Sequence, residues 1–174
     1  MTEREGSVRN LSMLDKFHQW MEEALSEAEK GARQGEVPIG AVLTDPEGNI
    51  VARSHNQPIS LKDPTAHAEI LVLRRAARIY QNYRLPGMTL TVTIEPCLMC
   101  MGAAIHARIS RLIYGAHDKK FGAAGSLYNL AADNRLNHRL EIISGIREDE
   151  CSDIIQSFFK TRRSSQKGEV PKWS

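Results

Sequence analysis

The segment TLTVTIEPCLMC, residues 89–100, joins an apolar, β-branched run to a proline and two cysteines that lie three positions apart. The run predicts a buried strand over residues 89–94, because β-branched side chains pack well on a pleated surface. Pro96 fits the first position of a helix, where its missing N–H leaves no hydrogen bond unmade. The segment therefore predicts a strand followed directly by a helix, with Cys97 and Cys100 on one face of the first helical turn.

The rest of the chain alternates between helical and strand periodicity in the same way. Helices are expected over residues 14–34, 66–80, 96–109 and 148–162. Strands are expected over residues 37–44, 50–52, 89–94, 111–114 and 140–143, with a turn at 46–49 and a polar loop at 55–65. This order predicts an α/β fold in which helices cover both faces of one sheet, a three-layer α/β/α arrangement.

The chain has 174 residues, of which 41% are hydrophobic and 25% charged, and these values fit one soluble globular domain. They exclude a collagen, a coiled-coil rod and a fully disordered chain. No run approaches the roughly eighteen apolar residues of a membrane helix, and no secretory signal is evident, so we expect a cytoplasmic protein without membrane contact. We expect a flexible N-terminal segment at residues 1–13, one domain at 14–163 and a flexible tail at 164–174.

Charge is distributed unevenly along the chain. The net charge is +2, yet the stretch from Phe158 onward holds five Lys or Arg and one acidic residue, which gives +4 and leaves −2 for the remainder. A basic segment on a slightly acidic body predicts a local anionic partner. A solvated tail without a partner is the alternative.

The cysteine pair has the spacing of a metal site. Thiols in the first turn of a helix have a lowered pKa, because the helix dipole favours negative charge there. With His67 they offer two thiolates and one imidazole, which leaves a fourth position for water, as in catalytic zinc sites. His55 and His106 remain open as a fourth ligand, and a redox pair or two buried cysteines are the alternatives.

Glu69 is the residue that distinguishes a catalytic site from a structural one. Residues two apart diverge in a helix interior, so His67 and Glu69 converge only where the helix begins. Asp63 or Thr65 is expected to cap that helix, with Pro64 in its first turn. A carboxylate beside a metal-bound water is a candidate proton shuttle, and a solvated helix-face residue is the alternative.

These motifs resemble the zinc-dependent cytidine and nucleobase deaminase superfamily, whose signature is H-x-E…P-C-x-x-C. Within it, the sequence is most similar to the bacterial tRNA adenosine deaminases, over residues 15–163. The resemblance is carried by Asn56 and by residues 36–42, 63–69, 95–103, 122–127, 137–139 and 158–163. The stretch GAAGSL at 122–127 and the ending FFKTRR at 158–163 are more specific to the tRNA enzymes than the zinc motif.

The resemblance implies a mixed five-stranded sheet of the cytidine deaminase type and a homodimer. It implies one zinc ion per subunit, held by His67, Cys97 and Cys100, with Glu69 as the catalytic proton shuttle. The implied activity is a hydrolase reaction of tRNA processing: adenosine becomes inosine at the wobble position of a tRNA anticodon stem-loop, an RNA-editing step. The resemblance also implies that the RNA is contacted by Asn56, Asp118, Phe158, Phe159, Arg162 and Arg163.

Adjacent helix residues face different ways, so we expect one of Phe158 and Phe159 to be buried in the core. The sequence departs from its relatives at Thr91, where an aromatic residue is frequent, and in the loop at 119–122, which has two lysines and a phenylalanine before its glycine. Both departures are expected to alter substrate fit.

Two other functions remain open. One is deamination of a free nucleoside or base, cytidine or guanine, and the other is a catalytically inactive RNA-binding partner subunit. A nucleotide cofactor is not expected, because no Gly-x-Gly-x-x-Gly follows a strand.

Overall fold

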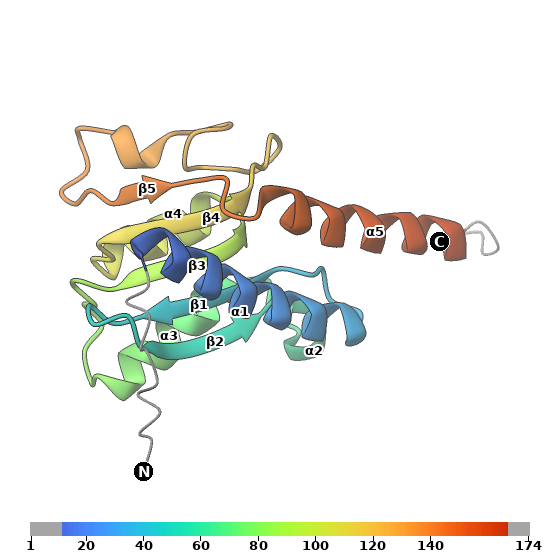
Figure 1. Ribbon diagram of the computed structural model, residues 1–174, viewed down its shortest axis with the longest axis horizontal. Coiled ribbons are helices and arrows are strands. Elements are labelled where there is room, and N and C mark those ends of the chain that lie inside the picture. Colours follow the sequence, from blue (N-terminus) through green and yellow to red (C-terminus); the bar gives the residue numbers. More distant parts are fainter. Residues whose placement is uncertain (1–11, 167–174) are drawn as a thin grey trace, which may run out of the picture.

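The fold is described from a computed structural model, over residues 12–166 (Figure 1). In chain order the elements are α1 (Met13–Arg33), β1 (Gly40–Thr44), β2 (Ile50–His55), α2 (Pro58–Leu61), α3 (Ala68–Ile79), β3 (Thr89–Ile94), α4 (Leu98–His106), β4 (Arg111–Ala116), the 3-10 helix η1 (Leu130–Ala132), β5 (Glu141–Ile143) and α5 (Glu148–Gln166). No helix among these residues is long and apolar enough to cross a membrane.

The five strands form one mixed sheet in the order β2-β1-β3-β4-β5. Strand β1 runs antiparallel to both β2 and β3, and β4 runs parallel to β3 and β5. The β1–β2 turn is closed by Asp45, whose carboxylate accepts a hydrogen bond from the backbone N–H of Asn49 at 2.8 Å. Parallel neighbours need a crossover, and α4 supplies the one between β3 and β4.

Helices cover both faces of this sheet, as the strand periodicity requires. Val42 and Ile113 pack in a core cluster with apolar residues of α1 and with Cys151 of α5. Their neighbours Leu43 and Leu112 belong to a second cluster, on α3 and α4. Successive strand residues point to opposite faces, so a single sheet feeds two cores. The predicted three-layer α/β/α fold with a mixed five-stranded sheet is confirmed.

Two local predictions differ from the structure. The expected loop at 55–65 contains α2, whose first amides, those of Ile59 and Ser60, donate to the buried Glu36 carboxylate at 3.3 and 2.7 Å. That cap comes from a residue more than twenty positions away, so local sequence does not reveal it. Helix α4 begins at Leu98 rather than at Pro96, because Cys97 is still extended and forms a β-bridge with Gly122.

The predicted division of the chain stays a prediction, because most of residues 1–13 and 164–174 lies outside the described residues. At the borders, Ser12 caps α1 through a capping box with Asp15, and α5 continues to Gln166.

The buried threonines of β3 differ in how their hydroxyl groups are satisfied. The Oγ1 of Thr93 accepts a hydrogen bond from the Gly40 N–H at 3.2 Å. Thr91 is fully buried beside Val42 and Ile113, and its Oγ1 has no hydrogen-bond partner among the described residues. A buried hydroxyl without a partner destabilises the fold.

We expect Thr91→Val to raise the free energy of unfolding by about 1 kcal/mol, because it removes an unpaired polar atom and keeps the shape. The matched control is Thr93→Val, which leaves the Gly40 N–H unpaired and lowers the free energy of unfolding by about 1 kcal/mol. Urea unfolding of both variants with metal bound measures the difference. Equal losses in the two variants would contradict this account of Thr91.

Candidate metal and catalytic centre

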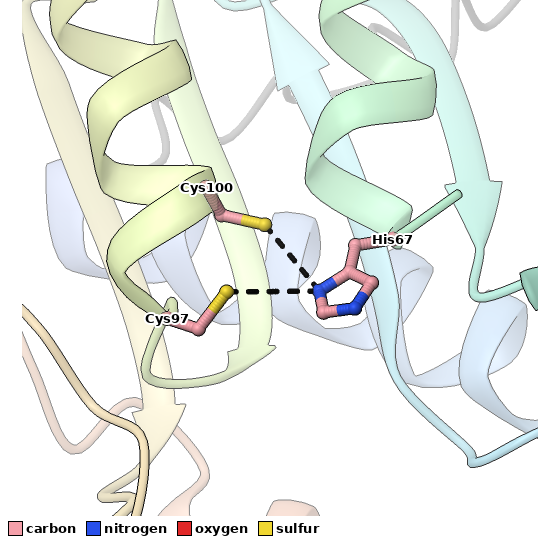
Figure 2. Close-up of side chains that lie close together, drawn as sticks. All are labelled: His67, Cys97 and Cys100. Carbon is pink, nitrogen blue, oxygen red and sulfur yellow. Dashed lines mark hydrogen bonds between the residues drawn. The ribbon is translucent and has the colours of Figure 1, made fainter. Parts of the chain in front are cut away.

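Three predicted site residues lie together where two helices begin. His67 is the N-cap of α3, Cys97 is the N-cap of α4, and Cys100 lies in the first turn of α4. Figure 2 shows the two sulfur atoms directed at the same nitrogen of His67. The Nδ1 atom is 3.7 Å from the Sγ of Cys97 and 3.5 Å from that of Cys100. All three potential ligand atoms lie within 4.8 Å of one another, close enough to hold one metal ion.

The backbone explains how residues far apart in sequence converge. His67 and Cys97 both have extended conformations, with ψ of 151° and 173°, and each is followed at once by helix. The first N–H groups of two helices therefore surround the site, where they favour negative charge on the ligands. The sequence predicted both cysteines inside the helix. In the structure Cys97 precedes α4 as its N-cap, and only Cys100 lies within the first turn.

The electrostatics of the three side chains favour a cation. A hydrogen bond from the Cys100 thiol, and a further one from His67, lower the pKa of Cys97 to about 4. The hydrogen bond with Cys97, together with burial, raises the pKa of Cys100, and the hydrogen bond with Cys97 also raises the pKa of His67. Negative charge therefore gathers on Cys97, the more exposed of the two cysteines, and a metal ion would be attracted there.

Glu69 lies in the first turn of α3 and is only 2% exposed, which contradicts the solvated alternative. Its Oε2 has no hydrogen-bond partner among the described residues. Burial raises the pKa of Glu69, because the charged form is poorly solvated, while His67 opposes this. A buried carboxylate beside the ligand group, with one oxygen unpartnered, is placed to exchange a proton with a bound molecule.

The two other candidate histidines do not join the ligand group. The Nδ1 of His55 lies 3.1 Å from a carboxylate oxygen of Glu27, and its Nε2 lies 3.1 Å from the amide oxygen of Gln34. His106 is the last residue of α4, at the end opposite to Cys97, and is exposed. Within residues 12–166, His67, Cys97 and Cys100 are the one group of this kind.

Asn56 takes the capping role that the sequence assigned to Asp63 or Thr65. Its Oδ1 accepts a hydrogen bond from the N–H of Ala68, the first residue of α3, at 2.9 Å. Asp63 instead accepts from the backbone and the hydroxyl of Thr65, three and more residues before the helix. Asn56 is 5% exposed, so a predicted substrate contact also holds the start of α3 in place.

Sequence reasoning assigned no role to Glu95, although the structure makes it central. Its buried carboxylate accepts hydrogen bonds from the N–H groups of Asp118 at 3.1 Å, Ala124 at 3.0 Å and Ser126 at 2.9 Å, and from the Ser126 hydroxyl. Burial by itself raises the pKa of Glu95, but these hydrogen bonds outweigh it and hold the pKa below its ordinary value. An ionised carboxylate thus ties the residue before Pro96 to the loop after β4.

Asp118, a predicted substrate contact, is part of that loop. Its Oδ1 accepts hydrogen bonds from the N–H groups of Lys120 at 2.9 Å and Phe121 at 3.1 Å, which closes a tight turn. Gly122 follows, and a Cβ there would lie 2.4 Å from the Cδ of Glu95. Only glycine therefore fits at this position.

The predicted RNA-binding residues of α5 lie apart from the metal group. Phe158 is half-buried and Phe159 is 43% exposed, with their rings edge to face at 5.5 Å. The expectation that one of them packs in the core is wrong, because α5 extends beyond the sheet after its first turns (Figure 1). The Arg162 guanidinium stacks 5.4 Å from the Phe158 ring centre, and both Arg162 and Arg163 are exposed.

This chain is similar to known deaminases over most of its length. The model of the MafB19-like deaminase family matches residues 15–163. The tRNA-specific adenosine deaminase of Haemophilus influenzae is 49% identical over 149 residues, which are 86% of each chain. That of Bacillus subtilis is 44% identical over 148 residues, 85% of this chain and 91% of the relative.

Two solved structures are similar to this chain in fold. One from a study of A-to-I editing by tRNA deaminases at the wobble position is 46% identical, with a TM-score of 0.76 over 78% of this chain and 98% of the other. A guanine deaminase from Nitrosomonas europaea has a TM-score of 0.71 at 21% identity, over 81% and 83%, and shows the fold alone. The fold and the site define a deaminase domain. The chain belongs to the family of tRNA-specific adenosine deaminases.

We expect Glu95→Gln to loosen the loop at residues 118–126. A glutamine offers one accepting oxygen and a donor NH2, so at least one loop N–H loses its partner. Hydrogen exchange should become faster at one or more of the amides of Asp118, Ala124 and Ser126 and stay unchanged in α1. Unchanged protection of all three loop amides would show that Glu95 does not anchor the loop.

Proposed function

We propose that this protein hydrolytically deaminates adenosine to inosine at the wobble position of a tRNA anticodon loop. The observation that carries the proposal is the convergence of His67, Cys97 and Cys100 beside the buried Glu69. The choice of a tRNA adenosine as substrate is supported by the names of relatives that share 44–49% of their residues with most of this chain. In this reaction water adds at C6 of the adenine and ammonia leaves.

The metal that suits this ligand set is zinc. Two thiolates and an imidazole are soft and borderline ligands, which favour zinc over magnesium or calcium. Three protein ligands leave a coordination position for water. When bound, zinc would lower the pKa of its water to near 7, which would make that water a nucleophile at neutral pH. We propose one ion per subunit, held by His67, Cys97 and Cys100.

Glu69 is proposed to move the protons of the reaction. Its buried carboxylate takes a proton from the attacking water and delivers it to N1 of the adenine. It then takes the proton of the new C6 hydroxyl group and passes it to the departing amine, so that C6 becomes a carbonyl, ammonia is released and the carboxylate is regenerated. The raised pKa of Glu69 suits this role, because the group must both accept and return a proton near neutral pH.

The proposed substrate contacts fall into two groups. Near the metal group, Asn56 keeps its side-chain NH2 for the target nucleoside while its oxygen caps α3. Farther away, α5 carries an aromatic and cationic surface made of the half-buried Phe158 and the exposed Phe159, Arg162 and Arg163. Exposed rings stack on unpaired bases and arginines neutralise phosphates, so α5 is proposed to contact the anticodon stem-loop.

The oligomeric state and the location are proposed with the substrate. A homodimer is supported by an open groove between α3 and α4, lined mainly by apolar residues such as Ile70, Leu73 and Ala103. A dimer would remove that apolar surface from water.

We propose the cytoplasm as the location, since a tRNA substrate and free thiols at the metal site both fit a reducing compartment.

The free-base alternative is weaker, although two guanine deaminases share the fold at 21% and 26% identity. Unpaired loop bases are accessible without melting a duplex, and the exposed surface of α5 suits an RNA rather than a small base. An inactive partner subunit is disfavoured by the presence of Glu69.

We expect the purified protein to hold one zinc per chain and to lose it in Cys97→Ser and in Cys100→Ala. The control is Cys151→Ala, because Cys151 is as fully buried as Cys100 but lies on the other face of the sheet. Elemental analysis of the folded proteins gives the stoichiometry. A full equivalent of zinc in Cys100→Ala would remove that residue from the ligand set.

We expect the zinc-loaded protein to form inosine in an anticodon stem-loop with adenosine at the wobble position, and no product from free adenosine or cytidine. Glu69→Gln should keep its zinc and lose activity by about 100-fold or more, because the proton shuttle is gone. Nucleoside analysis of the digested RNA measures both results. Product from free nucleosides alone would overturn the tRNA proposal, and an active Glu69→Gln would overturn the role of Glu69.

A further inference from the structure

The turn at residues 119–121 places an aromatic ring and two cations on the surface. Phe121 is 66% exposed, one of the most exposed large apolar side chains among the described residues. Lys119 and Lys120, which precede it, are exposed as well. A ring that remains in water adds little to the stability of the fold and is available to contact a partner.

The turn is held rigidly from beneath. The Oδ1 of Asp118 accepts hydrogen bonds from Lys120 and Phe121, and the Asp118 N–H donates to Glu95 at 3.1 Å. The N–H of Gly122 closes the turn on the Asp118 carbonyl at 2.9 Å. Phe121 therefore projects from a fixed backbone, which lowers the entropy lost when its ring binds a partner.

The turn also lies beside the metal group. Gly122, the residue after Phe121, forms a β-bridge with Cys97, and the N–H of Ala123 donates to the Pro96 carbonyl at 2.8 Å. Two consecutive residues of the loop are thus bound to the segment that carries a predicted zinc ligand. A nucleotide whose base enters the site has neighbours that must pass close to this turn.

We propose that Phe121 stacks on a nucleotide that flanks the target adenosine, and that Lys119 and Lys120 contact the adjacent phosphates. The inference rests on the proposed function and adds three residues that would bind the RNA beside the target nucleotide. Bases of single strands stack on exposed rings, and lysines neutralise the backbone between them. Asp118 is a positioning residue in this arrangement, because its Oδ1 shapes the turn.

The test uses the full-length, zinc-loaded protein and the anticodon stem-loop. Binding is measured by fluorescence anisotropy, with catalytically inactive Glu69→Gln as the background so that the RNA is not consumed. Phe121→Ala should weaken binding by about fivefold to a hundredfold, the range measured for loss of one base–aromatic stack. Phe121→Trp should bind like the parent, because it keeps an aromatic face. The control is Tyr80→Ala, which removes another exposed ring, at the end of α3 opposite to His67.

Two further readings separate direct contact from a structural effect. A stem-loop with 2-aminopurine on one side or the other of the target adenosine should be quenched by the parent protein and less by Phe121→Ala. The logarithm of the RNA association constant falls linearly with the logarithm of the salt concentration. Replacing either lysine by glutamine should make this slope less steep by about 0.7, the value for one phosphate contact on a single strand.

The outcomes distinguish this inference from the proposed function. If the protein with intact Glu69 edits the stem-loop while Phe121→Ala binds and quenches like the parent, the stacking proposal is overturned and the activity stands. If Phe121→Trp is as weak as Phe121→Ala, stacking is likewise excluded. If the intact protein neither binds nor edits the stem-loop, the proposed function fails and this inference falls with it.

Discussion

Glu95 accepts four hydrogen bonds from a loop that begins more than twenty residues later, and this anchoring connects the parts of the site. The carboxylate stands at the end of β3, immediately before Pro96 and the first cysteine. From there it fixes the loop after β4, which pairs with Cys97 through Gly122. Because the carboxylate is buried, each loop N–H that it binds would otherwise be costly to desolvate. Cys97 and the exposed turn at 119–121 are therefore held in a fixed position relative to each other.

The second constraint is the way the two helices begin. His67 and Cys97 are N-caps without side-chain capping bonds of their own, so their side chains are available to a metal. The missing cap of α3 is supplied from a distance by Asn56, and α2 is capped in the same manner by Glu36. Polar side chains around the site thus accept hydrogen bonds from the first N–H groups of the helices, while a few side-chain atoms are left without a partner and can bind a ligand. Glu69 Oε2 is one such atom.

The sheet provides the rigid base for these helix starts. Antiparallel pairing joins β1 to β3, and parallel pairing joins β3 to β4, so β3 lies in the centre with neighbours on both sides. Helix α4 must return from the end of β3 to the start of β4, which fixes where Cys97 stands. The peripheral α5 is under no such constraint beyond its first turns. Phe159, Arg162 and Arg163 are accordingly free to form an exposed surface rather than a core, with Phe158 half-buried beside them.

The sequence by itself determined the alternation of helices and strands, the α/β class and the residues His67, Glu69, Cys97 and Cys100, because these depend on local periodicity, short spacing and a shared motif. The tertiary structure decided the particular caps, the late start of α4 and the position of Phe158 and Phe159 outside the core. It also decided the role of Glu95, whose partners lie 23 to 31 residues away. Each of these depends on backbone groups brought close by the fold, and a buried N–H takes whichever acceptor the packing places beside it. The spacing of residues along the chain therefore cannot predict which distant acceptor pairs with a buried N–H.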